Sequence, residues 1–308
     1  MANVTPNDAL ENVLKSFHLP DSNSHKGQNG RLLIIGGSLV FHSASLWACE
    51  VASHFVDLVH YCSTQENNQI FINLKTKFTN GIVVPRKLLL PYVEENDCIL
   101  LGIGMERGPV DQSRFEPTPK FEALLDIVDE ASYTYSLIKF IIENYRSKRF
   151  IFDAAALQVM PALWLKQLEN PAIVTPHTRE FEVFFGLKLE DKTIAEKSSI
   201  VEKMAQKYNC VIVLKSTVDI VSDGKKTVLV SGGNSGLSKG GTGDVLAGLI
   251  GAFYTKNNPM TSSILASFIV KTAAETLYPS VGLWFNTADL IKKIPRVAKQ
   301  IFIDPHED

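Results

Sequence analysis

The sequence predicts a single α/β domain of three layers, in which a mostly parallel central sheet is flanked by helices. Short segments rich in β-branched residues alternate with longer amphipathic segments from residue 31 to residue 291, which is typical of parallel βαβ units. The 308-residue chain has no repeat, no low-complexity tract and no long linker rich in Ser, Gly or Pro. We therefore expect an N-terminal extension over 1–29 and one domain over 30–300.

The expected strands are short apolar runs, as buried parallel strands are. They are Arg31–Ile35, Leu58–Cys62, Gly81–Val84, Cys98–Ile103, Arg149–Asp153, Ala172–Thr175, Val211–Lys215, Asp219–Ser222 and Thr227–Val230. Asp223 and Gly224 lie between the last two strands and indicate a hairpin turn, so we expect an antiparallel edge on the sheet.

The expected helices have apolar residues at helical spacing. They are Ser43–Phe55, Ser132–Tyr145, Lys192–Tyr208, Asp244–Tyr254 and Met260–Leu277. The polar segment Asp21–Gly30 leads into the first strand, and we expect it to be mobile or to form a lid. Residues 106–119 contain three prolines and several charges, which predicts a surface loop.

Composition excludes several classes of partner. With 31 basic and 33 acidic side chains, the formal charge is −2, which gives no electrostatic footprint for binding nucleic acid. The four cysteines form no C-x-x-C pair and no cluster with zinc-ligand spacing. The longest apolar stretches, near 245–254 and 264–270, are too short to cross a membrane. With no recognisable secretory signal at 1–20, we expect a cytoplasmic protein without nucleic-acid or membrane partners.

The glycine-dense segment Gly232–Asp244 is the most informative stretch of the chain. Its end reads Lys-Gly-Gly-Thr-Gly-Asp and opens an apolar helix. A glycine loop at a helix start presents backbone N–H groups together with the positive end of the helix dipole, and this arrangement binds phosphate. Asp244 would repel a phosphate, so its place there suits a group that polarises an attacking hydroxyl. The alternative is a glycine-rich turn with Asp244 as an ordinary helix cap.

Further polar or glycine residues follow other expected strands at their carboxyl ends. Gly36–Ser38 follows the first strand, Asp153 ends another, and His177 and Glu180 lie just past a third. Ligands bind outside the carboxyl ends of the strands of an open parallel sheet. Turn chemistry explains each feature alone, but their combination with the phosphate-binding loop predicts a site at this edge.

Common catalytic signatures are missing from the sequence. It contains neither a G-x-x-x-x-G-K-[ST] phosphate loop nor a G-x-S-x-G nucleophile elbow. The segment Gly102–Gly108 is one residue too long for G-x-G-x-x-G, so a simple turn and a close approach to a ligand are equally compatible with it.

The ordered motifs resemble those of the NAD(P)H-hydrate dehydratase family within the ribokinase-like superfamily. The resemblance extends from about Gly30 to Pro295. It rests on GRLLIIGGS at 30–38, LGIG at 101–104, FDAAAL at 152–157, VTPH at 174–177, VLK at 213–215, KGGTGDVLAG at 239–248 and FNTADLI at 285–291. The last motif is similar to the final helix of that family. The resemblance implies a ribokinase-like fold.

The resemblance also implies a reaction in which hydrated NADH or NADPH is converted back to the reduced cofactor with ADP or ATP. The hydroxyl of the hydrate would be phosphorylated, and the phosphate then eliminated. In this reading the amides of Gly241, Thr242 and Gly243 hold the transferring phosphoryl group, and Asp244 is the base. Mg²⁺ would screen the nucleotide phosphates. We expect ADP as the donor, with ATP as the alternative, and no residue is predicted as a metal ligand.

Binding residues follow from the same resemblance. The nicotinamide nucleotide would contact Ala44, Gly104, His177, Asp153 and Asp244. The adenine nucleotide would contact Lys215, Ser216, Thr217, Val218, Asp219 and Gly243. We further expect a homo-oligomer. We also expect a separate epimerase in the pathway, because only 29 residues precede the expected domain.

The chain departs from the family pattern at three places: Ser43 and Ser216 replace glycines, and Thr178 and Arg179 stand where Pro and Gly are usual. Ser216 would crowd the adenine side, and Arg179 would place a cation at the substrate edge. Two other functions remain open. A small-molecule kinase of the same superfamily, acting on a hydroxymethylpyrimidine, a hydroxyethylthiazole or a sugar, would share the Gly-Thr-Gly-Asp base. A non-catalytic nucleotide-binding protein would not need Asp244.

Overall fold

A central sheet of nine strands organises the molecule. The computed structural model describes residue 11 and residues 13–304. In spatial order the strands are β3 (Ile82–Val84), β2 (Leu58–Cys62), β1 (Arg31–Ile35), β4 (Cys98–Leu101), β5 (Arg149–Phe152), β6 (Ala172–Val174), β7 (Cys210–Leu214), β8 (Asp219–Ser222) and β9 (Thr227–Val230). The strands from β3 to β7 pair in parallel, whereas β8 and β9 add an antiparallel edge.

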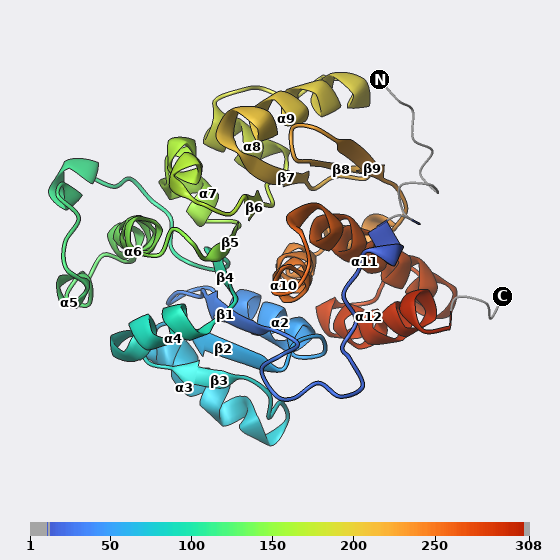
Figure 1. The fold of residues 1–308 in the computed structure, drawn as a ribbon, viewed down its shortest axis with the longest axis horizontal. Helices are drawn as coiled ribbons and strands as arrows, with labels where there is room; N and C mark the ends of the chain where they lie inside the picture. Colours follow the sequence, from blue (N-terminus) through green and yellow to red (C-terminus); the bar gives the residue numbers. More distant parts are fainter. Residues whose placement is uncertain (1–10, 12, 305–308) are drawn as a thin grey trace.

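Helices cover both faces of the sheet, and a separate apolar core lies under each layer. One core involves α2 (Ser43–Ala52), α10 (Thr242–Tyr254), α11 (Pro259–Val281) and α12 (Thr287–Phe302), which lie together in Figure 1. The other involves α4 (Leu89–Glu95), α5 (Phe121–Leu124), α6 (Glu130–Asn144), α7 (Ala156–Val159), α8 (Thr178–Phe185) and α9 (Ile194–Tyr208). A further helix, α3 (Gln65–Asn73), buries Phe71 in the first core.

The predicted fold class is confirmed: the chain forms one α/β domain with a mostly parallel sheet between helical layers. The nine expected strands are present within two residues at each end, and the antiparallel hairpin lies at the sheet edge. The helices α3, α4, α5, α7 and α8 are not among those expected from the sequence. They are short, and α3 carries several Asn and Gln residues, so its apolar pattern is weak.

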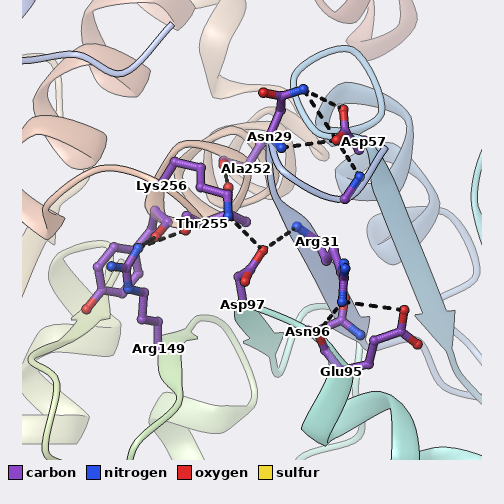
Figure 2. Close-up of polar contacts among 12 residues, drawn as sticks. Asn29, Arg31, Asp57, Glu95, Asn96, Asp97, Arg149, Ala252, Thr255 and Lys256 are labelled. Atoms are coloured by element: carbon purple, nitrogen blue, oxygen red, sulfur yellow. Dashed lines mark hydrogen bonds and ion pairs between the residues drawn. The ribbon is translucent and has the colours of Figure 1, made fainter. Parts of the chain in front are cut away.

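The prediction of a lid over Asp21–Gly30 is wrong. This segment enters β1 at the amino-terminal edge of the sheet, opposite the edge where the strands end. The backbone amides of Gly27 and Asn29 donate to the Asp57 carboxylate at 2.6 and 3.0 Å, as Figure 2 shows for Asn29. The segment is therefore anchored far from the predicted site. Residues 106–119 are a largely exposed loop, as expected.

Candidate active site

Five adjacent strands, β1 and β4 to β7, end at one edge of the sheet and bring the predicted residues together. Gly102 follows β4 with a φ of 109°, and a Cβ there would lie 2.2 Å from the Asp153 carbonyl oxygen. Only glycine allows the ends of β4 and β5 to approach so closely. Asp153 follows β5 and is buried, with 1% of its surface exposed.

The loop before α10 presents backbone amides toward this edge. Gly241 caps the helix with a φ of 99°, in the left-handed region that favours glycine. The Thr242 hydroxyl lies 2.6 Å from the Leu237 carbonyl oxygen and 2.9 Å from that of Lys239, which fixes the loop from within. The amides of Gly243 and Asp244 belong to the first turn of α10, where no intrahelical acceptor exists. Of these two, only the Gly243 amide is among those predicted from the sequence to hold a phosphoryl group.

A partly buried lysine connects this loop to the strand ends. The Lys215 Nζ lies 2.8 Å from Asp153 Oδ1 and 3.9 Å from Glu180 Oε2. A Cβ on Gly243 would be 3.5 Å from the same Nζ, so the ammonium group lies beside the first turn of α10. Lys215 thus places positive charge next to the amides predicted to hold a phosphoryl group.

Charge and burial act strongly on Asp244. Burial of its side chain, together with the negative charges of Asp153 and Glu180, raises the pKa of Asp244 to about 7, although Lys215 opposes the shift. Burial would lower the pKa of Lys215, but the neighbouring carboxylates outweigh it and raise that pKa. A carboxylate with a pKa near neutrality suits a general base at physiological pH.

His177 and Glu180 form a capping box at the start of α8. The Glu180 carboxylate accepts the His177 amide at 3.0 Å, and the His177 Nδ1 accepts the Glu180 amide at 3.3 Å. Because Nδ1 accepts a hydrogen bond, the proton of the neutral ring is assigned to Nε2. The ring is about half exposed. His177 therefore supports the local fold and also lines the neighbouring cavity.

A cavity of about 620 Å³ opens between β7, the glycine-rich loop and α11. Leu237, Leu246 and Val270 form apolar parts of its wall. The predicted residues His177, Lys215, Ser216, Thr217, Asp219, Thr242 and Gly243 also line it. Val218, also predicted as a nucleotide contact, is not a lining residue. The volume and the mixed lining suit a small organic ligand.

Two buried charged side chains, Lys271 and Asp219, hold the turn that follows β7. Lys271 Nζ donates to the carbonyl oxygens of Ser216 and Thr217 at 3.1 and 2.9 Å. Asp219 accepts the Ser216 amide at 2.8 Å and the Ser267 hydroxyl at 2.5 Å. Asp219 is therefore hydrogen-bonded within the protein and also lines the cavity.

The predicted substrate contacts Ala44 and Gly104 lie together beside the strand ends. A Cβ on Gly104, whose φ is 63°, would be 3.0 Å from the Ala44 Cβ and 3.4 Å from the Gly37 backbone. Because these residues are small, the loops that carry Gly37 and Gly104 lie close to each other and to the first turn of α2. They lie outside the 620 Å³ cavity, so the predicted site has two parts.

Several residues that contribute to the site are not among those predicted from the sequence. Glu180 is predicted only as a residue just past a strand, whereas Lys271, Trp47 and Thr287 carry no sequence signal. Their roles depend on contacts between distant segments, such as Lys271 with Ser216 and Thr287 with Gly240. Within the described part of the chain, no group of three or more His, Cys, Asp or Glu side chains is arranged to hold a metal ion. In the same residues, no helix has the length and apolar character needed to cross a membrane.

Comparison with known proteins places these features in a family. The family model for NAD(P)H-hydrate dehydratase matches residues 32–296. The ADP-dependent (S)-NAD(P)H-hydrate dehydratase of Nitrosopumilus maritimus is 30% identical over 97% of this chain and 98% of its own length. The bifunctional NAD(P)H-hydrate repair enzyme of Methanocaldococcus jannaschii is 32% identical over 93% of this chain, which spans only 51% of that protein.

Structural comparison supports the fold. The ADP/ATP-dependent NAD(P)H-hydrate dehydratase from Bacillus subtilis, crystallised with ATP and Mg²⁺, superimposes with a TM-score of 0.76 at 21% sequence identity. The match covers 98% of this chain and 100% of that one. The two share a fold, which is also similar to that of a ribokinase-like superfamily protein from Enterococcus faecalis, with a TM-score of 0.74 at 21% identity over 95% of this chain and 94% of that one. Together with the match over 32–296, these relationships show that the chain belongs to the NAD(P)H-hydrate dehydratase family.

Proposed function

We propose that this protein dehydrates the (S)-hydrate of NADH or NADPH with an adenine nucleotide as phosphoryl donor, and so acts as a carbon–oxygen lyase in cofactor repair. The observation that carries the proposal is Asp244, a largely buried carboxylate with a pKa raised to about 7. It lies in the first turn of α10, directly after the predicted phosphate-binding loop. A plain helix cap has no need of such a pKa.

The first step is phosphorylation of the hydrate. Asp244 accepts the proton of the hydroxyl group, whose oxygen attacks the terminal phosphorus of the donor. An O–P bond forms as the bridging O–P bond of the nucleotide breaks, which releases AMP from ADP or ADP from ATP. The phosphate then leaves with its C–O bond electrons, while the neighbouring carbon loses a proton and the ring double bond is restored. The sum consumes one phosphoanhydride bond and releases inorganic phosphate.

Backbone amides and a lysine side chain would stabilise the transferring phosphoryl group. The amides of Gly241, Thr242 and Gly243 face the charge that develops on the phosphoryl oxygens. The Thr242 amide now donates to the Lys239 carbonyl at 3.4 Å, a weak bond that a phosphate oxygen can replace. The Lys215 ammonium lies beside Gly243 and adds positive charge.

Nucleotide and hydrate occupy the two parts of the site in this proposal. The 620 Å³ cavity along Lys215–Asp219 takes the adenine nucleotide. The small residues Ala44 and Gly104, with Asp153, take the hydrated nicotinamide nucleotide, and His177, predicted as a further hydrate contact, lines the cavity itself. Asp244 directly follows Gly243, which lines the cavity, and in this proposal the hydroxyl and the phosphorus meet beside it.

A magnesium ion fits this site only when the phosphates of the bound nucleotide coordinate it. The described residues offer no cage of three or more acidic, His or Cys ligands, and the Asp153 carboxylate is paired with Lys215. Mg²⁺ in nucleotide sites is held mainly by phosphates and water, with few protein ligands. When bound in this way, it neutralises phosphate charge during the transfer. The phosphates of the nucleotide, rather than protein side chains, would hold the ion.

The remaining predictions concern the setting of the reaction. ADP is the proposed donor, in agreement with the name of the Nitrosopumilus relative, and ATP is the alternative. A cytoplasmic location, a homo-oligomer and a separate epimerase that supplies the (S)-hydrate belong to the same proposal. The four buried thiols, Cys49, Cys62, Cys98 and Cys210, are all unpaired, which agrees with a reducing compartment.

The test is recovery of NADH absorbance from purified NADH hydrate, with Mg²⁺ and either ADP or ATP. Recovery with release of inorganic phosphate supports the proposal and identifies the donor. No recovery with either nucleotide, from protein that binds ADP in calorimetry, would contradict it. A screen of small alcohols for phosphorylation would then test the kinase function, because that function uses the same Asp244 base.

A further inference from the structure

Trp47 of α2 packs directly on the loop that opens α10. The Cζ3 and Cε3 atoms of its indole lie 2.5 and 2.6 Å from the position that a Cβ on Gly241 would occupy. Only hydrogen fits in that space, so the indole is in van der Waals contact with the Gly241 backbone. Gly241 is also the residue with a φ of 99°. The ring therefore lies against the point where the loop turns into the helix.

Thr287 contacts the same residue. Its Oγ1 is 2.7 Å from the Cβ position of Gly241 and donates to the Gly240 carbonyl oxygen at 3.0 Å. Thr287 is the first residue of α12, whose start is fixed by a capping box between Asn286 and Asp289. The peptide between Gly240 and Gly241 is thus held between α2 and α12.

The α2 helix reaches both parts of the site. Ala44, one turn before Trp47, contacts the Gly104 loop on the proposed hydrate side. Farther along, a Cβ on Gly248 would lie 2.7 Å from the Ala48 Cα, so α2 and α10 are in close backbone contact. The position of Trp47 is therefore fixed relative to α10 as well as to the substrate side.

We propose that Trp47 is a positioning residue for phosphoryl transfer: its indole, with Thr287, holds Gly241 in the left-handed conformation and so aims the first amides of α10 at the phosphoryl group. A rotation of this peptide would turn those amides away from the charge that they stabilise. The inference rests on the proposed function, because it assigns Trp47 a role within that reaction.

Kinetics separate positioning from simple packing. In Trp47→Leu we expect kcat to fall about 10- to 100-fold, with the KM for the nucleotide changed less than about threefold, because well-aimed amides act mainly in the transition state. Trp47→Phe, which keeps an aromatic ring, should recover most of the rate. The matched control is Trp164→Leu, which removes another partly buried Trp from the opposite core. If Trp47→Leu lowers only the melting temperature and keeps the kcat of the wild type, the proposal is wrong.

A binding experiment tests the contact without turnover. The chain has three Trp residues, so Trp164→Phe combined with Trp284→Phe leaves Trp47 as the single indole. We expect ADP to change its emission and AMP, which lacks the terminal phosphate, to leave it unchanged. An equal response to both, or no response when calorimetry shows ADP binding, would overturn the proposal. A response to ADP alone, without conversion of NADH hydrate, would retain Trp47 as a phosphate-loop residue and reject the proposed function.

Discussion

Asp57 and Asp244 lie at opposite edges of the central sheet, and their pKa values are shifted in opposite directions. At the amino-terminal edge, Asp57 accepts two backbone amides, and these bonds lower its pKa even though partial burial acts to raise it. Asp97 there accepts the Arg31 amide at 2.9 Å and pairs with Lys256 at 3.4 Å, as Figure 2 shows. At the carboxyl edge, burial and neighbouring acids raise the pKa of Asp244 to about 7.

The helix α10 joins these two environments. At its C-terminal end, Arg149 donates to the carbonyl oxygens of Tyr254 and Thr255 at 2.7 and 2.8 Å, which satisfies acceptors at the negative end of the dipole (Figure 2). At its N-terminal end, the amides of the first turn face the site. One edge therefore satisfies its polar groups and stabilises the fold, whereas the other leaves donors and a base available for chemistry.

The largest expected effect comes from exchanging carboxylates for amides at the two edges. Asp244→Asn should lower turnover of NADH hydrate by about 10³-fold, because the base is lost, while the Kd for ADP changes little. Asp97→Asn, the matched change at the opposite edge, should leave turnover unaltered and lower the melting temperature. Steady-state kinetics and calorimetry measure both. If Asp244→Asn kept full turnover, Asp244 would not be the base, and the two edges would not differ in function as proposed.

Two glycines with positive φ provide the next comparison. Gly241→Ala would place a Cβ 2.5 Å from Trp47, and Gly30→Ala would place one 2.2 Å from the Thr255 hydroxyl. We expect Gly241→Ala to lower kcat about 10- to 100-fold through misdirected amides. Gly30→Ala should instead reduce the free energy of unfolding by about 2–4 kcal/mol without changing kcat per folded molecule. Equal losses of kcat in the two variants would show that strain alone is responsible.

The charge of Lys215 should set the pH range of activity. Lys215 lowers the pKa of Asp244 against burial and the neighbouring acids, so Lys215→Met should move the acidic limb of the kcat profile to higher pH. Lys256→Met removes a lysine that pairs with Asp97 at the other edge, and it should leave the profile in place. A profile for Lys215→Met that coincides with that of the wild type would argue against electrostatic coupling between these side chains.

The smallest effect concerns stability. The folded pKa of Asp244 is about 7, against an ordinary value of 3.8, so the folded protein binds more protons between these pH values. Stability of the wild type therefore falls as pH rises through this range. Asn does not titrate, so the stability of Asp244→Asn relative to the wild type should be about 2–3 kcal/mol greater at pH ~8 than at pH ~5, and this advantage should disappear only near pH ~4. Urea denaturation at the two pH values measures the difference.

The sequence was sufficient to predict local features of both edges but not the contacts between distant segments. The strands follow from their apolar runs, and Gly232–Asp244 predicts a phosphate-binding loop because its glycines immediately precede a helix. The ion pair of Lys215 with Asp153 joins residues 62 positions apart, and no periodicity relates them. The same holds for Trp47 and Gly241. The assignment of Asp21–Gly30 as a lid failed because polarity does not reveal that Asp57 anchors this segment.

The most direct test of Asp244 as the working base is the single-turnover rate of NADH recovery from NADH hydrate as a function of pH. Single turnover removes product release from the measurement. We expect the rate to rise about tenfold per pH unit up to a pH of about 7 and then to level, with no such dependence in the residual rate of Asp244→Asn. A wild-type rate that stays constant between about pH 5 and pH 8 would contradict the role of Asp244 as the base.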